Sequence, residues 1–324
     1  MVKEIVVATR ASNLATRQTE LIISLLKKIQ PGIKIRTDKT ITQGDRDSRP
    51  FFVMNKTGVF EKEVNEKLLR YQADFAVHSL KDLHAGISDK LIIACIPRRE
   101  KPNDVFINST DDKKLDRLSP GSIIGTSSIR RALQIKTRYP HLKIKSIRGN
   151  VETRLNRSKE KKYSGIILAE AGIDRLGLFN HITQRLDIRS FTPAPGQGAL
   201  AIVCRKEDTD LCILLKKIEH ARSQIEVQAE RSLTDAIGAG CTVPLGALAS
   251  TQIKQKRISL YAVVYSLDGR KTIKVAKQYG IDHPIELGKM VADDLISKGA
   301  KEITKEWNNN NNNMNIDVLN ELIG

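Results

Sequence analysis

The chain has 324 residues, enough for two or three domains of ordinary size and for a large buried core. Apolar residues make up 40% of it and the formal net charge is +17, so we expect a folded protein with an anionic partner. No run approaches the ~18 apolar residues of a membrane span, and Met1 to Ser12 lacks the pattern of a secretory signal. These observations predict a cytoplasmic protein, and the charge alone fits a nucleic acid, an anionic membrane or a polycarboxylate as its partner.

The first third of the chain alternates short β-rich runs with helical patterns, which is typical of parallel sheets covered by helices. Ser12 or Asn13 can cap a helix that continues to about Gln30, where Pro31-Gly32 ends it. Phe60, Val64 and Leu68 mark a second helix. The predicted strands of this segment are residues 3–9, 33–41, 75–79 and 91–96.

A polar, proline-bounded stretch at 97–102 predicts a crossing into a second lobe, where the alternation restarts. Strands are expected at 122–125, 143–147 and 165–169, each followed by a helix. Thr192 to Gly196 predicts a second crossing, and 199–204 a further strand. Two such crossings predict a bilobal α/β body of two periplasmic-binding-protein-like lobes around a cleft.

The pattern changes after about Ser223 to a helix at 224–237, a glycine-flanked loop, further strands and a long helix at 285–298, which indicates a smaller α+β domain. Six asparagines at 308–313 offer nothing to bury and predict disorder. We therefore expect domain 1 at 1–98 and 197–218, domain 2 at 99–196, domain 3 at 219–307, and a disordered tail at 308–324.

Arginines and hydroxyls follow several predicted strands, where ligands of open α/β sheets bind. The members of this set are Arg10, Ser12, Thr126, Ser128, Arg130, Arg131, Arg148, Arg154 and Arg175. Several arginines at strand ends imply a ligand with several carboxylates or phosphates. A solvated basic turn behind an N-cap serine is an equally good interpretation of residues 125–131 alone. A nucleic-acid groove would add aromatic stacking residues, which these segments lack.

Lys81 and Asp82 follow the apolar run 75–79, at the same rim of the expected cleft. An aspartate among cations stays ionised and can stabilise a cation that forms on a substrate, although spacing alone favours a solvated Lys-Asp pair. His78 is interpreted as a packed residue. The cysteines and histidines show no zinc-site spacing, so no metal is expected. Cys95 and Cys204 lie in apolar runs, whereas Cys241 lies in a glycine-flanked loop where an exposed thiol would be nucleophilic.

Ten ordered motifs over roughly residues 5–306 resemble the porphobilinogen deaminase family, whose members are also called hydroxymethylbilane synthases. They are ATRAS at 8–12, TQGD at 42–45, GVFEKE at 58–63, ADFAVHSLKD at 73–82, GTSSIRR at 125–131, IRGNVETRL at 147–155, LAEAGIDRLG at 168–177, PAPGQGAL at 193–200, AERSL at 229–233 and GAGCTVPLG at 238–246. The resemblance implies a transferase of tetrapyrrole and haem biosynthesis that joins four porphobilinogen molecules head to tail into hydroxymethylbilane and releases ammonia.

The resemblance also implies one covalent dipyrromethane cofactor per chain, held by a thioether on Cys241. It further implies a monomeric enzyme without a nucleic-acid or membrane partner. Asp82 matches the catalytic aspartate, which would hold pyrrole N–H groups and stabilise the cation left when ammonia departs. The residues that match cofactor-binding positions are Lys81, Thr126, Ser128, Arg130, Arg131 and Arg154. Those that match substrate-binding positions are Arg10, Ser12, Gln18, Phe60, Arg148 and Arg175.

Two positions depart from the family pattern. Thr57 stands where lysine is common, which puts the basic role of that loop in doubt, and His84 stands where proline is usual, which would loosen the turn behind Asp82. Two other functions fit the residues themselves: a non-enzymatic protein that binds a small polyanion, and a nucleic-acid-binding protein. A steep salt dependence of nucleic-acid binding would support the second.

Overall fold

The computed structural model describes residues 4–46, 61–84, 86–160, 162–238, 243–266 and 268–309. Its contacts divide the chain into two compact units. Unit 1 contains residues 1–48, 56–100 and 198–224, and unit 2 contains 49–55, 101–197 and 225–324. The expected division into three domains remains a prediction.

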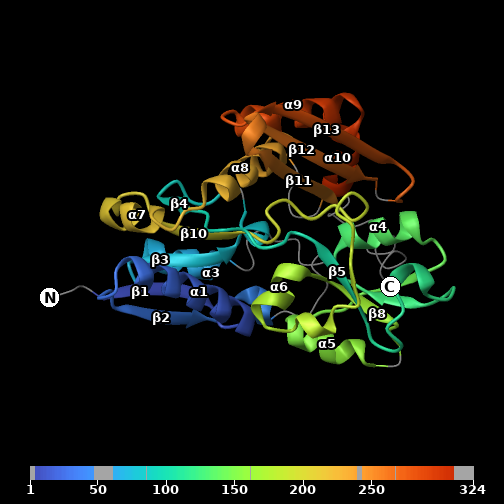
Figure 1. Ribbon diagram of the computed structural model, residues 1–324, viewed down its shortest axis with the longest axis horizontal. Helices are drawn as coiled ribbons and strands as arrows, with labels where there is room; N and C mark the ends of the chain where they lie inside the picture. Colours follow the sequence, from blue (N-terminus) through green and yellow to red (C-terminus); the bar gives the residue numbers. More distant parts are fainter. Residues whose placement is uncertain are drawn as a thin grey trace. The chain divides into compact units, whose positions relative to one another are not determined.

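Unit 1 contains a five-stranded sheet in the order β2-β1-β3-β10-β4 (Figure 1). Its strands are β1 (Ile5–Arg10), β2 (Ile35–Thr40), β3 (Phe75–Ser79), β4 (Leu91–Cys95) and β10 (Leu200–Arg205). The predicted strands are confirmed. The parallel arrangement expected from the alternating pattern holds for β1, β2 and β3 but not for β10. β10 runs antiparallel to both β3 and β4, because it enters the sheet where β3 ends, with Leu80 N–H donating to Ala199 O at 3.0 Å.

The helices of unit 1 are α1 (Asn13–Ile29), α2 (Gln43–Arg46), α3 (Lys62–Leu69) and α7 (Thr209–Lys216). Ser12 caps α1 by accepting from Ala15 N–H, as predicted. Ile22 and Leu26, four residues apart, place their side chains on one face of α1 and are fully buried with Phe75 of β3 in one apolar cluster. The amphipathic pattern of this segment therefore fixes both the helix and the face that packs on the sheet.

The first sheet of unit 2 has the order β7-β6-β8-β5-β9. Its strands are β5 (Asp104–Asn108), β6 (Ile123–Gly125), β7 (Lys143–Lys145), β8 (Gly165–Ala169) and β9 (Gln184–Arg185), with helices α4 (Ile129–Arg138), α5 (Val151–Ser158) and α6 (Glu170–Arg175). β6, β7 and β8 are parallel as predicted. β5, which the sequence analysis did not predict, is buried throughout and runs antiparallel to β8 and β9.

The second sheet of unit 2 is antiparallel, in the order β11-β12-β13. It comprises β11 (Leu245–Gln252), β12 (Arg257–Tyr265) and β13 (Thr272–Gly280), and it accompanies α8 (Ala221–Ala236), α9 (Pro284–Ser297) and α10 (Ala300–Asn309). Leu133 of α4 belongs to the apolar cluster of this sheet, so the two sheets of unit 2 share buried contacts. Asn308 and Asn309 end α10, whereas the rest of the predicted tail lies outside the described residues.

Buried glutamates of α8 join this helix to its surroundings. Glu230 is fully buried, and its carboxylate accepts from Gly196 N–H at 2.6 Å and from Ala249 N–H at 2.9 Å. Glu226 accepts from the N–H and the hydroxyl of Thr251, both at 3.0 Å. The AERSL motif therefore connects the proline-rich second crossing to β11.

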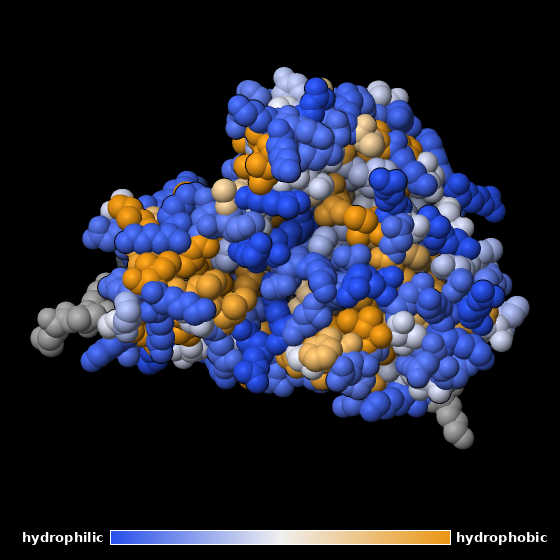
Figure 2. Space-filling model, viewed as in Figure 1, coloured by the Kyte–Doolittle hydropathy of each residue, from blue (hydrophilic) through white to orange (hydrophobic). Residues whose placement is uncertain are grey.

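Four short 3-10 turns complete the described secondary structure, at Leu80–Asp82, Leu115–Arg117, Phe179–His181 and Ile253–Gln255. Hydrophilic residues dominate the face drawn in Figure 2, in keeping with the charge of +17. Within the part of the chain that the structure describes, no helix is both long enough and apolar enough to cross a membrane.

Candidate functional site

One edge of the unit 1 sheet carries most of the site residues predicted for this unit. β1, β2 and β3 are parallel, so their carboxyl ends meet at the same edge. Arg10 and Ser12 lie at the end of β1, and the 3-10 turn Leu80–Asp82 follows β3 directly. Asp82 is exposed and Lys81 is half-buried. The sheet therefore brings Arg10, Lys81 and Asp82 to one edge, as the sequence predicts.

A second carboxylate at this edge, Asp45 of the TQGD motif, was not singled out by the sequence analysis. It forms an ion pair with Arg10 and accepts from the N–H and hydroxyl of Thr42 at 3.1 and 2.8 Å. Burial acts to raise the pKa of Asp45, but the hydrogen bonds and charge of Arg10 outweigh it and hold that pKa below its ordinary value. Asp45 is thus a partner of Arg10. Among the residues that the structure describes, the Asp82 carboxylate forms no such ion pair or hydrogen bond.

Several polar groups behind this edge already have internal partners. The Gln18 side chain is buried and donates to Ser79 Oγ at 3.0 Å, and Ser12 Oγ caps α1. His78 is buried as predicted, with Nε2 2.9 Å from Asn65 Oδ1. Burial, with a smaller contribution from the Arg10 charge, lowers the pKa of His78 to about 4. The substrate-binding roles of Ser12 and Gln18 remain predictions.

Two hydrogen bonds at His84 hold the turn behind Asp82, although His84 in place of proline predicts a looser turn. His84 N–H donates to Glu61 Oε2 at 2.8 Å, and its ring Nδ1 accepts from Gly86 N–H at 3.0 Å. A proline has no N–H and could not make the first of these bonds. The hydrogen bond from His84 N–H to the buried Glu61 therefore restrains this turn, as the rigid ring of a proline would otherwise do.

The corresponding edge of unit 2 is formed by the segments that follow β6 and β7. Ser127 Oγ donates to Ile147 O at 2.7 Å, which joins the two segments. Thr126 is buried and its hydroxyl accepts from Ser128 N–H at 3.2 Å. Asn150 caps α5 by accepting from Thr153 N–H at 2.7 Å. Hydroxyls and the start of α4 therefore lie beside the segment that carries the half-buried Arg148.

Gly149 sets the geometry between Arg148 and the α5 cap. Its φ is +114°, a conformation that residues with a side chain rarely adopt. A Cβ at this position would also lie 2.5 Å from the Thr153 methyl group. Arg154, half-buried on the first turns of α5, donates from Nε to Asn150 O at 3.4 Å. The turn at Gly149 thus places Arg148 just before the start of α5, on whose first turns Arg154 lies.

Arg130 and Arg131 have a partner that the sequence did not indicate. Both are buried, and both pair with the fully buried Asp104, through Nη2 atoms at 2.9 and 2.7 Å. Burial acts to raise the pKa of Asp104, but the two guanidiniums lower it well below its ordinary value. The alternative interpretation of residues 125–131 as a solvated basic turn is therefore wrong for these two arginines, because both are buried beside the carboxylate of Asp104. Their role toward a ligand remains a prediction.

Further donors surround this Asp104 cluster, defined as Asp104, Arg130, Arg131 and Gln197. Gln197 Nε2 donates to Asp104 Oδ1 at 2.9 Å and to Pro102 O at 2.6 Å. Because Pro102 lies on the first crossing and Gln197 directly follows the second, the cluster connects α4 to both of these segments within unit 2. An aspartate that begins an apolar strand, as in DVFIN, is the sequence signal that could have revealed it.

A second buried carboxylate, Glu170, lies where β8 ends. It is fully buried and pairs with Arg185 through contacts of 2.5 to 2.8 Å, and with Lys101 at 3.1 Å. Burial acts to raise the pKa of Glu170, but these cations lower it. Arg175 lies half-buried at the end of the same helix, α6. Glu170 therefore serves the fold, and its acidity cannot be read as a sign of catalysis.

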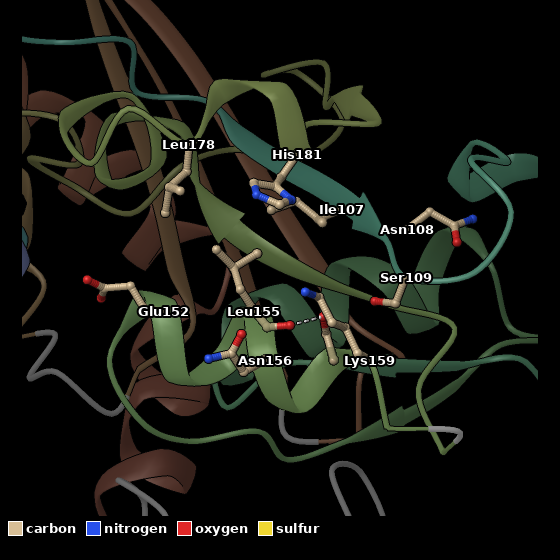
Figure 3. A pocket seen from close by; sticks show the side chains of 10 residues that line it. Ile107, Asn108, Ser109, Glu152, Leu155, Asn156, Lys159, Leu178 and His181 are labelled. Atoms are coloured by element: carbon tan, nitrogen blue, oxygen red, sulfur yellow. Dashed lines mark hydrogen bonds between the residues drawn. The ribbon is translucent and has the colours of Figure 1, made fainter.

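Three positions named in the sequence analysis lie outside the described residues: Phe60, Thr57 and Cys241. A cavity of about 260 Å³ in unit 2 involves none of the predicted arginines; Ile107, Ser109, Glu152, Leu155, Leu178 and His181 are among its lining residues (Figure 3). Among the histidines, cysteines and acidic residues of the described ranges, no group of three could hold a metal ion.

The protein is an α/β protein with two sheet-containing lobes and a small C-terminal sheet. Its cationic strand ends suit an organic ligand with several carboxylates. Residues 5–212 match the family model "Porphobilinogen deaminase, dipyromethane cofactor binding domain", and residues 224–297 match "Porphobilinogen deaminase, C-terminal domain". The chain belongs to the porphobilinogen deaminase family. It is a transferase that polymerises porphobilinogen into hydroxymethylbilane, and its cofactor is dipyrromethane.

Its relatives include the "Probable porphobilinogen deaminase" of Nitrosopumilus maritimus, 42% identical over 302 residues, which cover 93% of this chain and 96% of the relative. The porphobilinogen deaminase of Staphylococcus carnosus is 41% identical over 309 residues, with 94% and 99% covered. Among solved structures, the methionine-binding protein MetQ has a TM-score of 0.43 and 14% identity, and the match covers 66% of this chain and 89% of MetQ.

Proposed function

We propose that Asp82 is the catalytic carboxylate of this porphobilinogen deaminase. The observation that carries this proposal is the contrast between two carboxylates at one sheet edge: Asp45 is engaged by Arg10 and Thr42, whereas Asp82 is exposed. An exposed carboxylate beside Lys81 can accept hydrogen bonds from pyrrole N–H groups. It can also stabilise the positive charge that develops on the substrate as ammonia leaves.

The cationic strand ends would hold the acetate and propionate groups of the pyrroles. Guanidinium groups bind carboxylates through two parallel hydrogen bonds, and hydroxyls add further donors. We assign Lys81, Thr126, Ser128, Arg130, Arg131 and Arg154 to the cofactor, and Arg10, Ser12, Gln18, Phe60, Arg148 and Arg175 to the substrate and the growing chain. For Arg130 and Arg131, this role would come in addition to their pairing with Asp104.

The donor set of unit 2 fits the dipyrromethane, because half-buried arginines and hydroxyls at parallel strand ends match a group that bears several carboxylates. When bound, this cofactor supplies the free pyrrole carbon to which new rings are added. Thr126 and Ser128 would orient its carboxylates through their hydroxyls. Cys241 would hold it through a thioether, which survives turnover while the product is released by hydrolysis.

We further propose that the enzyme is a monomer in the cytoplasm and has no nucleic-acid partner. Within the described ranges, Cys95, Cys204 and Cys212 are free thiols, as is typical of a reducing compartment. The strand-end arginines stand beside hydroxyls rather than aromatic rings. Sedimentation analysis should give the mass of one chain, and nucleic acid should not bind near physiological salt.

The test is the intact mass of purified full-length enzyme before and after incubation with porphobilinogen, with peptide mapping of the adduct. The wild type should carry two pyrrole units on Cys241 and gain single units on incubation. Asp82→Asn, loaded with the cofactor, should keep its fold and lose nearly all bilane formation. Near-normal turnover by this variant would refute the assignment of Asp82.

Asp89→Asn is the matched control. Asp89 is also exposed, but it precedes β4, at the opposite edge of the same sheet. It should turn over at the wild-type rate. Cys241→Ser should lack the pyrrole adduct, and an adduct on Cys95, Cys204 or Cys212 would move the attachment site.

A further inference from the structure

Two cysteines of unit 1 lie in contact on neighbouring elements. Cys204 is on β10 and Cys212 is the fourth residue of α7, and their Sγ atoms are 3.2 Å apart. A disulfide bond is about 2.0 Å long, so closing it would bring the two sulfurs nearer by about 1.2 Å. This is within reach of a side-chain rotation of Cys212, whose Sγ also donates to Arg205 O at 3.7 Å.

We propose that Cys204 and Cys212 form a reversible dithiol–disulfide pair, an oxidation site separate from the catalytic chemistry. The oxidant class is a low-molecular-weight disulfide. The Cys212 thiolate attacks one sulfur of the reagent, whose other half leaves as a thiol after taking up a proton. Cys204 then loses its proton and attacks Cys212 Sγ, which expels the second reagent thiol. Two protein thiols are oxidised, and one reagent disulfide is reduced to two thiols.

The difference in burial between Cys204 and Cys212 determines the order of these two steps. Cys204 is fully buried, whereas Cys212 is half-buried and accessible to a small reagent. Burial, and then the hydrogen bond with Cys212, raises the pKa of the Cys204 thiol, so Cys204 is a poor first nucleophile. Once the reagent is attached to Cys212, the neighbouring sulfur at 3.2 Å is already in position. Cys212 is therefore the entry point, and Cys204 the resolving thiol.

The β10 strand is firmly held next to this pair. Arg205 is buried, and its Nη1 donates to Leu68 O at 2.9 Å and to Ala73 O at 2.7 Å. These bonds fix the end of β10 on the neighbouring elements of unit 1. Closure of the bond is therefore expected to shift α7 locally rather than the sheet.

The pair lies at the far end of the strand from the catalytic edge. In the antiparallel register, Cys204 is opposite Phe75, at the start of β3, whereas Leu200 is opposite Ser79, just before Lys81 and Asp82. Four residues of strand separate these two positions, or roughly 13 Å. Oxidation of the pair should therefore leave turnover unchanged. Because the disulfide would link β10 to α7, it should also raise the midpoint temperature of thermal unfolding.

The experiment exposes the folded, cofactor-loaded enzyme to oxidised glutathione, blocks remaining thiols, and maps tryptic peptides without reduction. Trypsin cuts between the two cysteines, after Arg205 and Lys206, so the disulfide joins peptide 190–205 to peptide 207–216. The wild type should lose two hydrogens in mass and yield this linked pair. Cys95, buried in β4, should stay reduced and serve as the internal control.

Cys204→Ala is the decisive variant, because it removes the resolving thiol and leaves Cys212 in place. It should retain a glutathione adduct on Cys212, whereas the wild type should pass through that adduct to the internal bond. If Cys204→Ala does not fold, Cys212→Ser provides a second test. It should show neither the linked peptides nor a glutathione adduct on Cys204. Persistent glutathione on wild-type Cys212, a link that involves Cys95, or a pair that stays reduced would each overturn the proposal.

Discussion

Replacement of Asp104 by asparagine tests the buried cluster of unit 2 most directly. The wild-type carboxylate is fully buried and faces Arg130 at 2.9 Å, Arg131 at 2.7 Å and Gln197 at 2.9 Å. Asp104→Asn keeps the shape of the side chain but leaves two buried guanidiniums without a counter-charge. Breaking a buried ion pair by removing one partner costs about 3–5 kcal/mol. Because two arginines lose their carboxylate together, we expect a value near the upper end of that range.

Such a loss is a large part of the ~5–15 kcal/mol by which proteins of this kind are stable. The assay is urea unfolding followed by circular dichroism, from which the midpoint and slope give the free energy of unfolding. The matched control is Asp116→Asn, whose wild-type carboxylate lies 3.9 Å from Arg117 and is exposed. A surface pair of this kind contributes about 0–1 kcal/mol.

The pH dependence gives the same test a second readout. The cations lower the folded-state pKa of Asp104, so the stabilisation is fully present above the ordinary aspartate pKa and is lost as the pH falls toward the folded value. Asp104→Asn should lack this part of the acid sensitivity. Equal destabilisation by Asp104→Asn and Asp116→Asn would refute the reasoning about buried charge.

The remaining predictions concern His78 and Gly149. Burial lowers the pKa of His78 from 6.5 to about 4, so the folded protein should lose up to about 3 kcal/mol of stability as the pH falls from 6.5 to 4. His78→Gln can keep the hydrogen bond to Asn65 and should reduce this loss, which unfolding curves at several pH values would measure. An unchanged pH dependence would contradict the assignment. Gly149→Ala should destabilise the enzyme by about 1–3 kcal/mol and impair adduct formation, because a positive φ and the close Thr153 methyl group both oppose a Cβ. Normal stability and adduct mass in this variant would show that the Arg148–Asn150 geometry does not require glycine.

The sequence by itself determined the elements that have a local cause. Amphipathic spacing and the Ser12 cap predict α1, short apolar runs predict β1, β3 and β8, and the ordered motifs identify the family. The edge that carries Arg10, Lys81 and Asp82 also follows from sequence order, because consecutive parallel strands end on the same side.

Only the tertiary structure decided which charged side chains form ion pairs inside the protein and so stabilise the fold. Arg130 and Arg131 look like ligand-binding residues in GTSSIRR, yet they meet Asp104, which lies 26 residues before Arg130 in the chain. Arg10 meets Asp45 across the ends of β1 and β2, and β10 runs antiparallel because of where its crossing enters the sheet. Pairings between distant residues depend on how the strands are brought together in space, and a buried charge takes the counter-charge that this packing places beside it.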